Sequence, residues 1–178
     1  GDLATLNVDG SNFTEFFIDS LNVGSSATVN LAPGTYWIRD LTLDAGASIN
    51  ILGGTAHIYV GRNVNWASNT NINSPAQDAS DNPENLFMYF YRDVSFGDSL
   101  TLNGTVYGAR DITVADSSKI YGLLTGEDIT LGSESTITYD ERAYNGLSTI
   151  TWCEAGVVTI GSINIIAPGT AINCLPAP

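Results

Sequence analysis

Basic residues are scarce in this chain of 178 amino acids. Six lysine and arginine residues stand against nineteen aspartate and glutamate residues, which gives a formal net charge of -13 at pH 7. Binding to a nucleic acid depends on cations that neutralise its phosphates, and this chain has few of them. Anionic membrane surfaces are disfavoured for the same reason. We therefore expect no nucleic-acid partner.

Histidine, cysteine and long apolar runs are also scarce. His57 is the single histidine and has no serine or cysteine motif beside it, and the two cysteines lack the paired spacing of a metal site. Asp140 and Glu141 are neighbours in sequence, whereas glycoside hydrolysis needs two facing carboxylates. No apolar run reaches the length of about 18 residues that a membrane-spanning helix needs. The sequence therefore predicts a non-catalytic protein without membrane insertion and without a required cofactor.

What the sequence does contain is a short phrase that recurs five times. Each copy has a charged residue, an Asp or Asn, a branched apolar residue, a polar residue and a final apolar residue. The copies occupy residues 39–43, 62–66, 92–96, 110–114 and 127–131, and a weaker copy occupies 19–23. The last three copies start 18 and 17 residues apart, which is too short for a helical repeat and suits one coil of a β-solenoid.

Each coil is predicted to contain three short strands around an apolar interior. One strand carries the phrase, a second ends in an apolar residue, and a third precedes the charged residue, with Gly, Asp, Ser and Asn at the corners. We expect an all-β fold, a single-stranded, right-handed parallel β-helix with about three strands per coil and capping termini. The predicted interior columns are Leu41, Val64, Val94, Ile112 and Ile129, and beside them Leu43, Trp66, Phe96, Val114 and Leu131.

Three segments follow from this pattern. Residues 1–18 are expected to cap the first coil, residues 19–147 to form the solenoid, and residues 148–178 to form a carboxyl-terminal extension. Within the cap, Asn12 and Glu15 have capping-box spacing, so residues 12–18 are a candidate helix, with a strand as the equal alternative. Cys153 and Cys174 are predicted to form a disulfide, which would place the protein outside the cytoplasm, and two buried thiols are the alternative.

Tyrosines recur three residues before the charged position of the repeat. If strand alternation holds, these side chains point outward and form a strip suited to sugar rings or to a protein partner. The alternative is that one of the terminal segments covers them. The predicted strip contains Tyr36, Tyr59, Tyr89 and Tyr107.

A long insertion at residues 74–85 accounts for the widest spacing between repeats. Asp78, Asp81 and Glu84 supply the oxygen ligands that calcium accepts, although no EF-hand spacing is present. A solvated acidic loop is the more ordinary interpretation, because long loops on a regular scaffold need no metal. Calcium is therefore a candidate cofactor only.

Columns of charged and hydroxyl residues have structural and functional interpretations. Arg and Asp at the first two positions of the phrase favour a ladder in which opposite charges offset one another, and a calcium-assisted proton abstraction on this face is the alternative. Thr42, Thr113 and Thr130 form part of a threonine column of the kind that an ice-binding solenoid presents, but Lys119 interrupts the neighbouring column.

Several phrases resemble one known kind of domain. Residues 33–38 and 41–50, followed by 83–86, 103–108 and 138–141, are similar to a β-helical repeat domain of bacterial cell-surface and pilus-associated proteins of the MshQ type. The resemblance implies an exported module of a larger Gram-negative surface protein that acts in adhesion by presenting or binding a glycan or a protein ligand. It supplies no catalytic residues. A rigid spacer, a carbohydrate-active lyase or hydrolase, and an ice-binding solenoid remain the alternatives.

Overall fold

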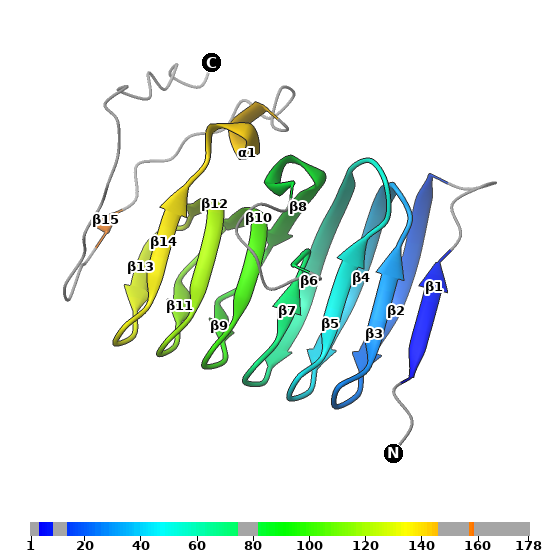
Figure 1. Cartoon of the computed structure of the whole chain (residues 1–178), viewed down its shortest axis with the longest axis horizontal. Helices are drawn as coiled ribbons and strands as arrows, with labels where there is room; N and C mark the ends of the chain where they lie inside the picture. Colours follow the sequence, from blue (N-terminus) through cyan, green and yellow to red (C-terminus); the bar gives the residue numbers. More distant parts are fainter. Residues whose placement is uncertain (1–3, 9–13, 75–81, 146–156, 159–178) are drawn as a thin grey trace.

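The computed structural model describes residues 4–8, 14–74, 82–145 and 157–158, and within them the chain is a β-solenoid of about six turns (Figure 1). Successive coils stack along the long axis of the molecule. The elements are β1 (Thr5–Val8), β2 (Glu15–Val23), β3 (Thr28–Leu31), β4 (Gly34–Leu43), β5 (Ser48–Ile51), β6 (Ala56–Trp66), β7 (Asn71–Ile72), the 3-10 helix η1 (Pro83–Asn85), β8 (Leu86–Phe90), β9 (Val94–Phe96), β10 (Thr101–Gly108), β11 (Ile112–Val114), β12 (Lys119–Thr125), β13 (Asp128–Leu131), β14 (Thr136–Tyr139), α1 (Glu141–Asn145) and β15 (Val157–Val158).

Every strand pair in the described part of the chain is parallel. An eleven-stranded sheet has the order β1-β3-β5-β7-β10-β8-β6-β4-β2, with β12 and β14 continuing from β10. A second sheet of four strands has the order β15-β13-β11-β9. Parallel neighbours one coil apart are the signature of a β-helix, because each strand pairs with the equivalent strand of the next coil. The predicted all-β solenoid is confirmed.

The three strand segments of each coil join differently in the two halves of the molecule. In the first half, β4 and β6 run through the corner that leads into the repeated phrase. In the second half, β10 runs through another corner, since its residues 101–102 pair with β7 and its residues 105–108 pair with β8. Three segments per coil were predicted, and the continuous strands show that the chain stays extended through one corner in each coil, with the pairing interrupted or shifted at the corner itself.

The predicted interior column is present. Leu41 pairs with Val64, and Ile112 lies between Val94 and Ile129. Val64 is half-buried and the other four are buried. The same alternation repeats along each strand, so that one face of every coil faces the inside. At about 1.5–3 kcal/mol per large side chain, this burial is the main force that stacks the coils.

One corner has the same backbone conformation in every coil. Its central residue has a positive φ, and its N–H donates to a carbonyl of the following coil: Ser26 to Ala45, Ser99 to Asp116 and Ser117 to Ser133. Small or polar residues tolerate this left-handed conformation best, which explains their recurrence between the apolar segments. The residues in this conformation are Ser26, Gly46, Asn69, Ser99, Ser117 and Glu134.

The amino-terminal segment differs from the predicted cap. Residues 15–18 belong to β2, so the strand alternative holds there and the candidate helix over 12–18 is wrong for its described part. β1 pairs with β3 in parallel, so the first coil begins near Thr5, inside the segment predicted as a cap. The apolar residues of this segment fit the spacing of a helix as well as that of a strand, which explains the difference. In the structure, Phe16 and Ile18 alternate inward as strand residues and pack against the core.

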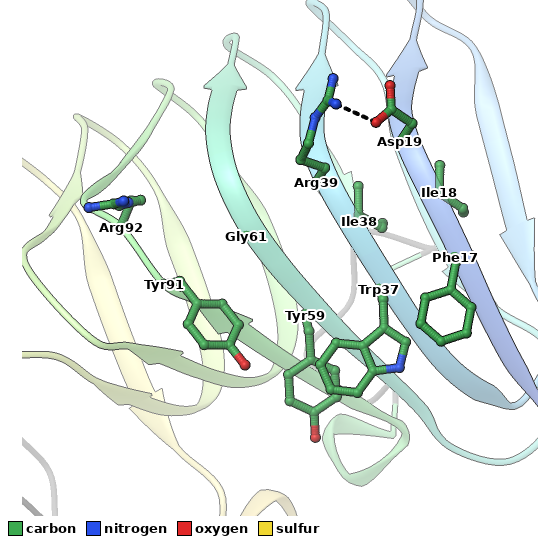
Figure 2. A pocket seen from close by; sticks show the side chains of 10 residues that line it. All are labelled: Phe17, Ile18, Asp19, Trp37, Ile38, Arg39, Tyr59, Gly61, Tyr91 and Arg92. Carbon is green, nitrogen blue, oxygen red and sulfur yellow. Dashed lines mark ion pairs between the residues drawn. The ribbon is translucent and has the colours of Figure 1, made fainter.

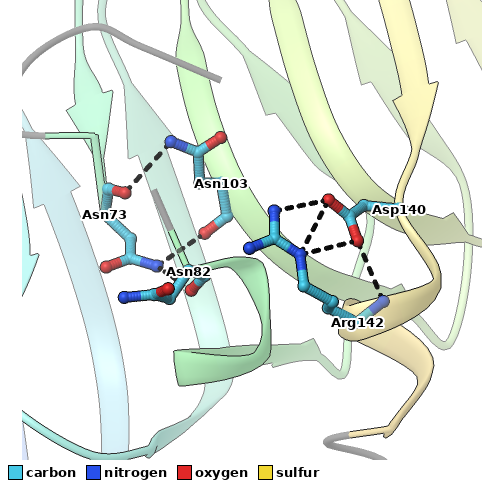
Figure 3. A network of polar contacts seen from close by, with 5 residues as sticks. All are labelled: Asn73, Asn82, Asn103, Asp140 and Arg142. Carbon is cyan, nitrogen blue, oxygen red and sulfur yellow. Dashed lines mark hydrogen bonds and ion pairs between the residues drawn. The ribbon is translucent and has the colours of Figure 1, made fainter. Parts of the chain in front are cut away.

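Buried asparagines hold the base of the long insertion (Figure 3). The Asn73 side-chain amide donates to the carbonyls of Asn82 and Asn103, at 3.1 and 3.0 Å. In return, the Asn103 amide donates to the carbonyl of Asn73 at 3.2 Å. Asn73 also has a φ of 51°, a left-handed conformation that asparagine tolerates. These contacts fasten the two ends of the insertion to the neighbouring coil.

Replacing Asn73 with alanine is therefore expected to lower the free energy of unfolding by about 2 kcal/mol. The change removes the donor from the buried carbonyl of Asn103 and from the partly buried carbonyl of Asn82, and it places alanine at a positive φ. Urea unfolding followed by circular dichroism measures the loss. Asn22→Ala is the matched control, because Asn22 is exposed and its amide bonds only to the nearby Ser20 hydroxyl. Equal midpoints for the two variants would contradict the anchoring role.

Candidate functional site

The exposed aromatic residues of the solenoid form one row across the strands. Parallel register places Phe17, Trp37, Tyr59, Tyr89 and Tyr107 beside one another in that order, from β2 to β10. We call these five residues the aromatic strip. Phe17 is 78% exposed, and the other four are half-buried, so the strip is not covered within the described part of the chain.

Tyr36 does not belong to this row, and the prediction that it does is wrong. Tyr36 is fully buried and pairs with Phe16 and Ile58, in the column next to the strip. Its ring stacks on Phe16 at 4.6 Å between centroids, and its hydroxyl donates to the carbonyl of Ala32 at 2.7 Å. Trp37 occupies the outward position instead.

A register shift explains the error. Ile38 pairs with Val60, but Asp40 pairs with Asn63, so β6 contains one more residue than β4 at this corner. With one extra residue at the corner, the side chains before the corner and those after it still face the interior correctly. Only the number of residues between the aromatic strand and the repeated phrase changes. A prediction that counts backwards from the charged residue therefore selects Tyr36 in one coil and Tyr59 in the next, although they face opposite sides.

A similar offset ends the row. Tyr107 pairs with Thr125, whereas Leu124, which lies three residues before the charged Glu127, pairs with Val106 and packs against the core. The next position of the row is thus polar, and the aromatic strip ends at β10. Tyr59, Tyr89 and Tyr107 stand where the sequence placed them.

The rings of the strip pack mainly on one another. Trp37 stacks on Tyr59 at 4.4 Å with 17° between the planes, and Tyr89 stacks on Tyr107 at 4.9 Å with 13°. Phe17 lies 6.5 Å from Trp37 at 11°. In each stacked pair the two rings cover the faces that meet, so the inner part of the strip presents mainly ring edges to solvent, whereas Phe17 at the end of the row is largely exposed. Aromatic edges carry partial positive charge, which favours oxygen atoms and anions over apolar ligands.

An open hollow of about 810 Å³ lies beside the strip (Figure 2). Phe17, Trp37 and Tyr59 stand along one side of it, and Tyr91 stands next to Tyr59. Gly61, which has no side chain, lies between the aromatic row and the charged residues on the opposite side. Those charged residues are Asp19, Arg39 and Arg92.

The charged residues of the hollow are not all paired. Arg39 forms ion pairs with Asp19 and with Asp40, and the hydrogen bond from its guanidinium lowers the pKa of the Asp40 carboxyl. The Asn63 amide also donates to Asp40, at 2.6 Å. Arg92 is exposed and makes no ion pair with any residue that the structure describes.

The charge ladder predicted along the repeat is only partly formed. Its first rung contains the Arg39 pairs described above. Arg62 and Arg110 are exposed and, like Arg92, form no ion pair within the described ranges. Four of the six basic residues of the chain thus lie along one row next to the aromatic surface, and three of them have cationic groups that no described carboxylate neutralises.

The hydroxyls of Tyr59 and Tyr89 remain protonated around neutral pH. Partial burial raises the pKa of Tyr59 above the usual tyrosine value, and neighbouring Tyr91 adds to the shift. Burial likewise raises the pKa of Tyr89, with Tyr107 and Tyr91 contributing. A protonated phenol can donate as well as accept a hydrogen bond. The strip therefore combines hydroxyl donors with electropositive ring edges.

The remaining predicted sites lie only partly within the residues that the structure describes. Asp78 and Asp81 lie outside the described residues, and Glu84 is half-buried in η1. No group of three or more candidate metal ligands occurs among the described residues. Cys153 and Cys174 also lie outside them, so the disulfide stays a prediction. His57 lies half-buried against Phe87, and burial lowers its pKa.

The acidic pair after the last repeat has a structural role. Asp140 accepts hydrogen bonds from the backbone N–H and the guanidinium of Arg142, at the start of α1 (Figure 3). The hydrogen bond from the Arg142 side chain is the main cause that lowers the pKa of Asp140. No described helix is long and apolar enough to cross a membrane.

A parallel β-solenoid with an exposed aromatic strip and an adjacent charged hollow is thus the class of protein that the fold and site define. Residues 3–145 match the family model described as a domain of unknown function, DUF7305, and the chain belongs to this family. No curated protein and no solved structure matches the chain.

Sequence reasoning found three of the five strip residues but missed most of the residues that line the hollow. Phe17, Trp37, Tyr91 and Arg92 line the hollow but were not predicted as ligand-binding residues. The sequence holds a signal for Phe17 and Trp37. Phe16 and Phe17 precede the repeated phrase in the same way as Tyr36 and Trp37 do, and strict alternation assigns one residue of each pair to each face of the strand. For Gly61 and Arg92 the sequence offers no comparable signal, because their proximity depends on the corner between two sheets.

Proposed function

We propose that this chain is a non-catalytic, ligand-binding module of a bacterial cell-surface or pilus-associated protein and that it acts in adhesion. The aromatic strip is the observation that carries the proposal. Large aromatic side chains are costly to leave in water, and soluble proteins rarely align five of them on one face unless the face binds something. The resemblance to repeat domains of Gram-negative surface proteins supports an extracellular location.

The arrangement of carboxylates supports a binding role over hydrolysis. Asp19 is the only carboxylate among the described residues that line the hollow, and Arg39 pairs with it. Acid-base cleavage of a glycosidic bond uses two carboxylates of different protonation state on either side of the bond. A hollow with one paired carboxylate and a stacked aromatic wall is suited to holding a ligand without transforming it.

Loss of binding on replacing Trp37 with alanine is the expected result. Wild-type protein and the Trp37→Ala variant are applied to an array of glycans and host-matrix proteins, because Trp37 lies between Phe17 and Tyr59 in the strip and lines the hollow. We expect the wild type to bind at least one ligand class and the variant to lose about tenfold or more in affinity, as aromatic residues at binding surfaces commonly do. Thermal melting of both proteins verifies that the fold is retained.

Thr113→Ala is the matched control on another face. Thr113 is exposed in β11, in the second sheet, and lies outside the residues that line the hollow. The control is expected to bind like the wild type. Absence of any ligand on the array would favour a rigid spacer, and chemical turnover of a bound acidic glycan would favour a lyase or hydrolase. Either outcome contradicts the proposal.

A further inference from the structure

We infer that the ligand of the hollow is an acidic glycan, a linear polysaccharide whose sugars carry carboxylate or sulfate groups. This inference rests on the proposed function and adds the chemical class of the ligand. Three features of the hollow lead to it: the local charge, the orientation of the aromatic rings and the repeating geometry of the solenoid.

The hollow contains an unpaired cationic group although the chain as a whole is acidic. The protein carries a formal charge of -13, and the charged residues that line the hollow are Arg39, Arg92 and Asp19. Arg39 forms ion pairs with Asp19 and Asp40, whereas the exposed guanidinium of Arg92 has no ion pair with a described carboxylate. A guanidinium holds a carboxylate or sulfate through two parallel hydrogen bonds, so an anionic group is the natural partner of Arg92.

The orientation of the rings also favours an oxygen-rich anion. A neutral sugar ring usually binds by placing its C–H groups over an aromatic face, but the faces of Trp37 and Tyr59 cover each other at 4.4 Å. The exposed ring edges carry partial positive charge, and the protonated hydroxyl of Tyr59 can donate a hydrogen bond. Sugar hydroxyls and acidic groups are complementary to such a wall.

The repeat geometry favours a polymer over a compact ligand. Equivalent residues recur at every coil, at the strand spacing of about 4.8 Å, so the donors form a line along the solenoid axis. Arg62 and Arg110 hold the same position of the repeated phrase as Arg92, and all three are exposed. A nucleic acid is a poor match to this surface, because single strands bind by stacking bases on open aromatic faces, and most rings of the strip turn a face toward a neighbouring ring. A linear acidic glycan combines repeated anionic groups with hydroxyls.

The first test compares ligands on the wild-type chain. Oligogalacturonate, a neutral cello-oligosaccharide of equal length and polyglutamate are titrated by calorimetry, with a sulfated oligosaccharide to distinguish sulfate from carboxylate. We expect one of the two acidic oligosaccharides to bind at least tenfold more tightly than the neutral one. Equal binding of the neutral sugar would overturn the inference, and so would tight binding of polyglutamate, which would make the ligand an acidic peptide.

The second test uses two variants that alter the hollow and leave the packing intact. Arg92→Gln removes the exposed charge and is expected to weaken binding of the acidic oligosaccharide by about tenfold or more. Gly61→Gln fills the space between the aromatic and charged sides. A Cβ at Gly61 would lie 3.8 Å from the carbonyl oxygen of Ile38, an ordinary contact, so the fold accommodates the new side chain while the ligand is excluded.

Lys119→Gln is the matched control, because it removes an exposed positive charge that lies outside the row of arginines and does not line the hollow. The affinity of this variant is expected to stay within about threefold of wild type. If Trp37→Ala loses binding while Arg92→Gln does not, the acidic ligand class is wrong and the binding module stands. If no oligosaccharide binds and Trp37→Ala changes nothing on the array, the proposed function itself fails. Equal losses in Arg92→Gln and Lys119→Gln would indicate non-specific charge attraction and also overturn the inference.

Discussion

Replacing Gly122 with alanine is expected to lower the melting temperature of this protein by about 10 °C. Gly122 lies in β12, pairs with Gly104 of the preceding coil and has a φ of 130°. A Cβ at this position would overlap the carbonyl oxygen of Gly104 and would also lie 3.3 Å from the Cβ of Ala143. Neither neighbour is the movable end of a long side chain, so the backbone itself has to shift.

The size of the effect follows from two costs. An L-residue at such a φ costs about 1–3 kcal/mol, and forcing an extra carbon into a packed site costs about 1–3 kcal/mol more. A combined loss of about 3 kcal/mol corresponds to the expected shift for a chain of this length. Circular dichroism during heating measures it.

Gly24→Ala is the control for the same chemical change. Gly24 also lies in the solenoid, but no atom would come within 4 Å of its Cβ, and its φ is not positive. We expect its melting temperature to change by about 2 °C or less. A Gly122→Ala variant that melts with the control would show that the two coils do not approach so closely.

Replacing Ile112 with aspartate is expected to abolish folding. Ile112 is 1% exposed and lies between Val94 and Ile129 in the interior column. A carboxylate there has no described cation to pair with in the apolar column, and burying it costs several kcal/mol on top of the lost apolar contacts. This loss is comparable with the total stability of about 5–15 kcal/mol typical of a domain. The variant should be recovered in the insoluble fraction or lack the strand signal in circular dichroism.

Thr113→Asp provides the control within the same strand. Thr113 follows Ile112 directly, is exposed, and pairs with Ser95 and Thr130, which carry no charge. We expect this variant to fold and to melt within about 5 °C of the wild type. Similar behaviour of the two variants would contradict the inward and outward alternation on which the whole solenoid depends.

The regular part of the fold was predictable because each coil repeats the same alternation of apolar and polar residues. Leu41 and Ile112 sit at the same place in their phrases, and an apolar residue that alternates with polar neighbours must face the interior. The weaker copy at residues 19–23 was recognised, but the strand residues before it were assigned to a cap, because Asn12 and Glu15 also match a helical start. Local signals compete there, and pairing of β2 with β4 decided between them.

The candidate site was predictable only where the repeat is regular. Tyr59 and Tyr89 were placed on the outer face by alternation, and they share the strip. Tyr36 was misplaced and Trp37 was overlooked, since a single extra residue in β6 changes the count between the charged phrase and the aromatic strand. No feature of one sequence marks that residue as extra.

Taken by itself, the sequence determined that the chain coils, which segments pair in parallel and which side chains fill the interior, because those properties follow from a two-residue alternation repeated at a nearly constant spacing. Only the tertiary structure decided which aromatic residues share the exposed face and that Gly61 and Arg92 border the same hollow. These relations depend on the strand register at a corner of the coil. One inserted residue at that corner reverses the inward or outward direction of the side chains that precede the corner, when they are counted back from the charged phrase.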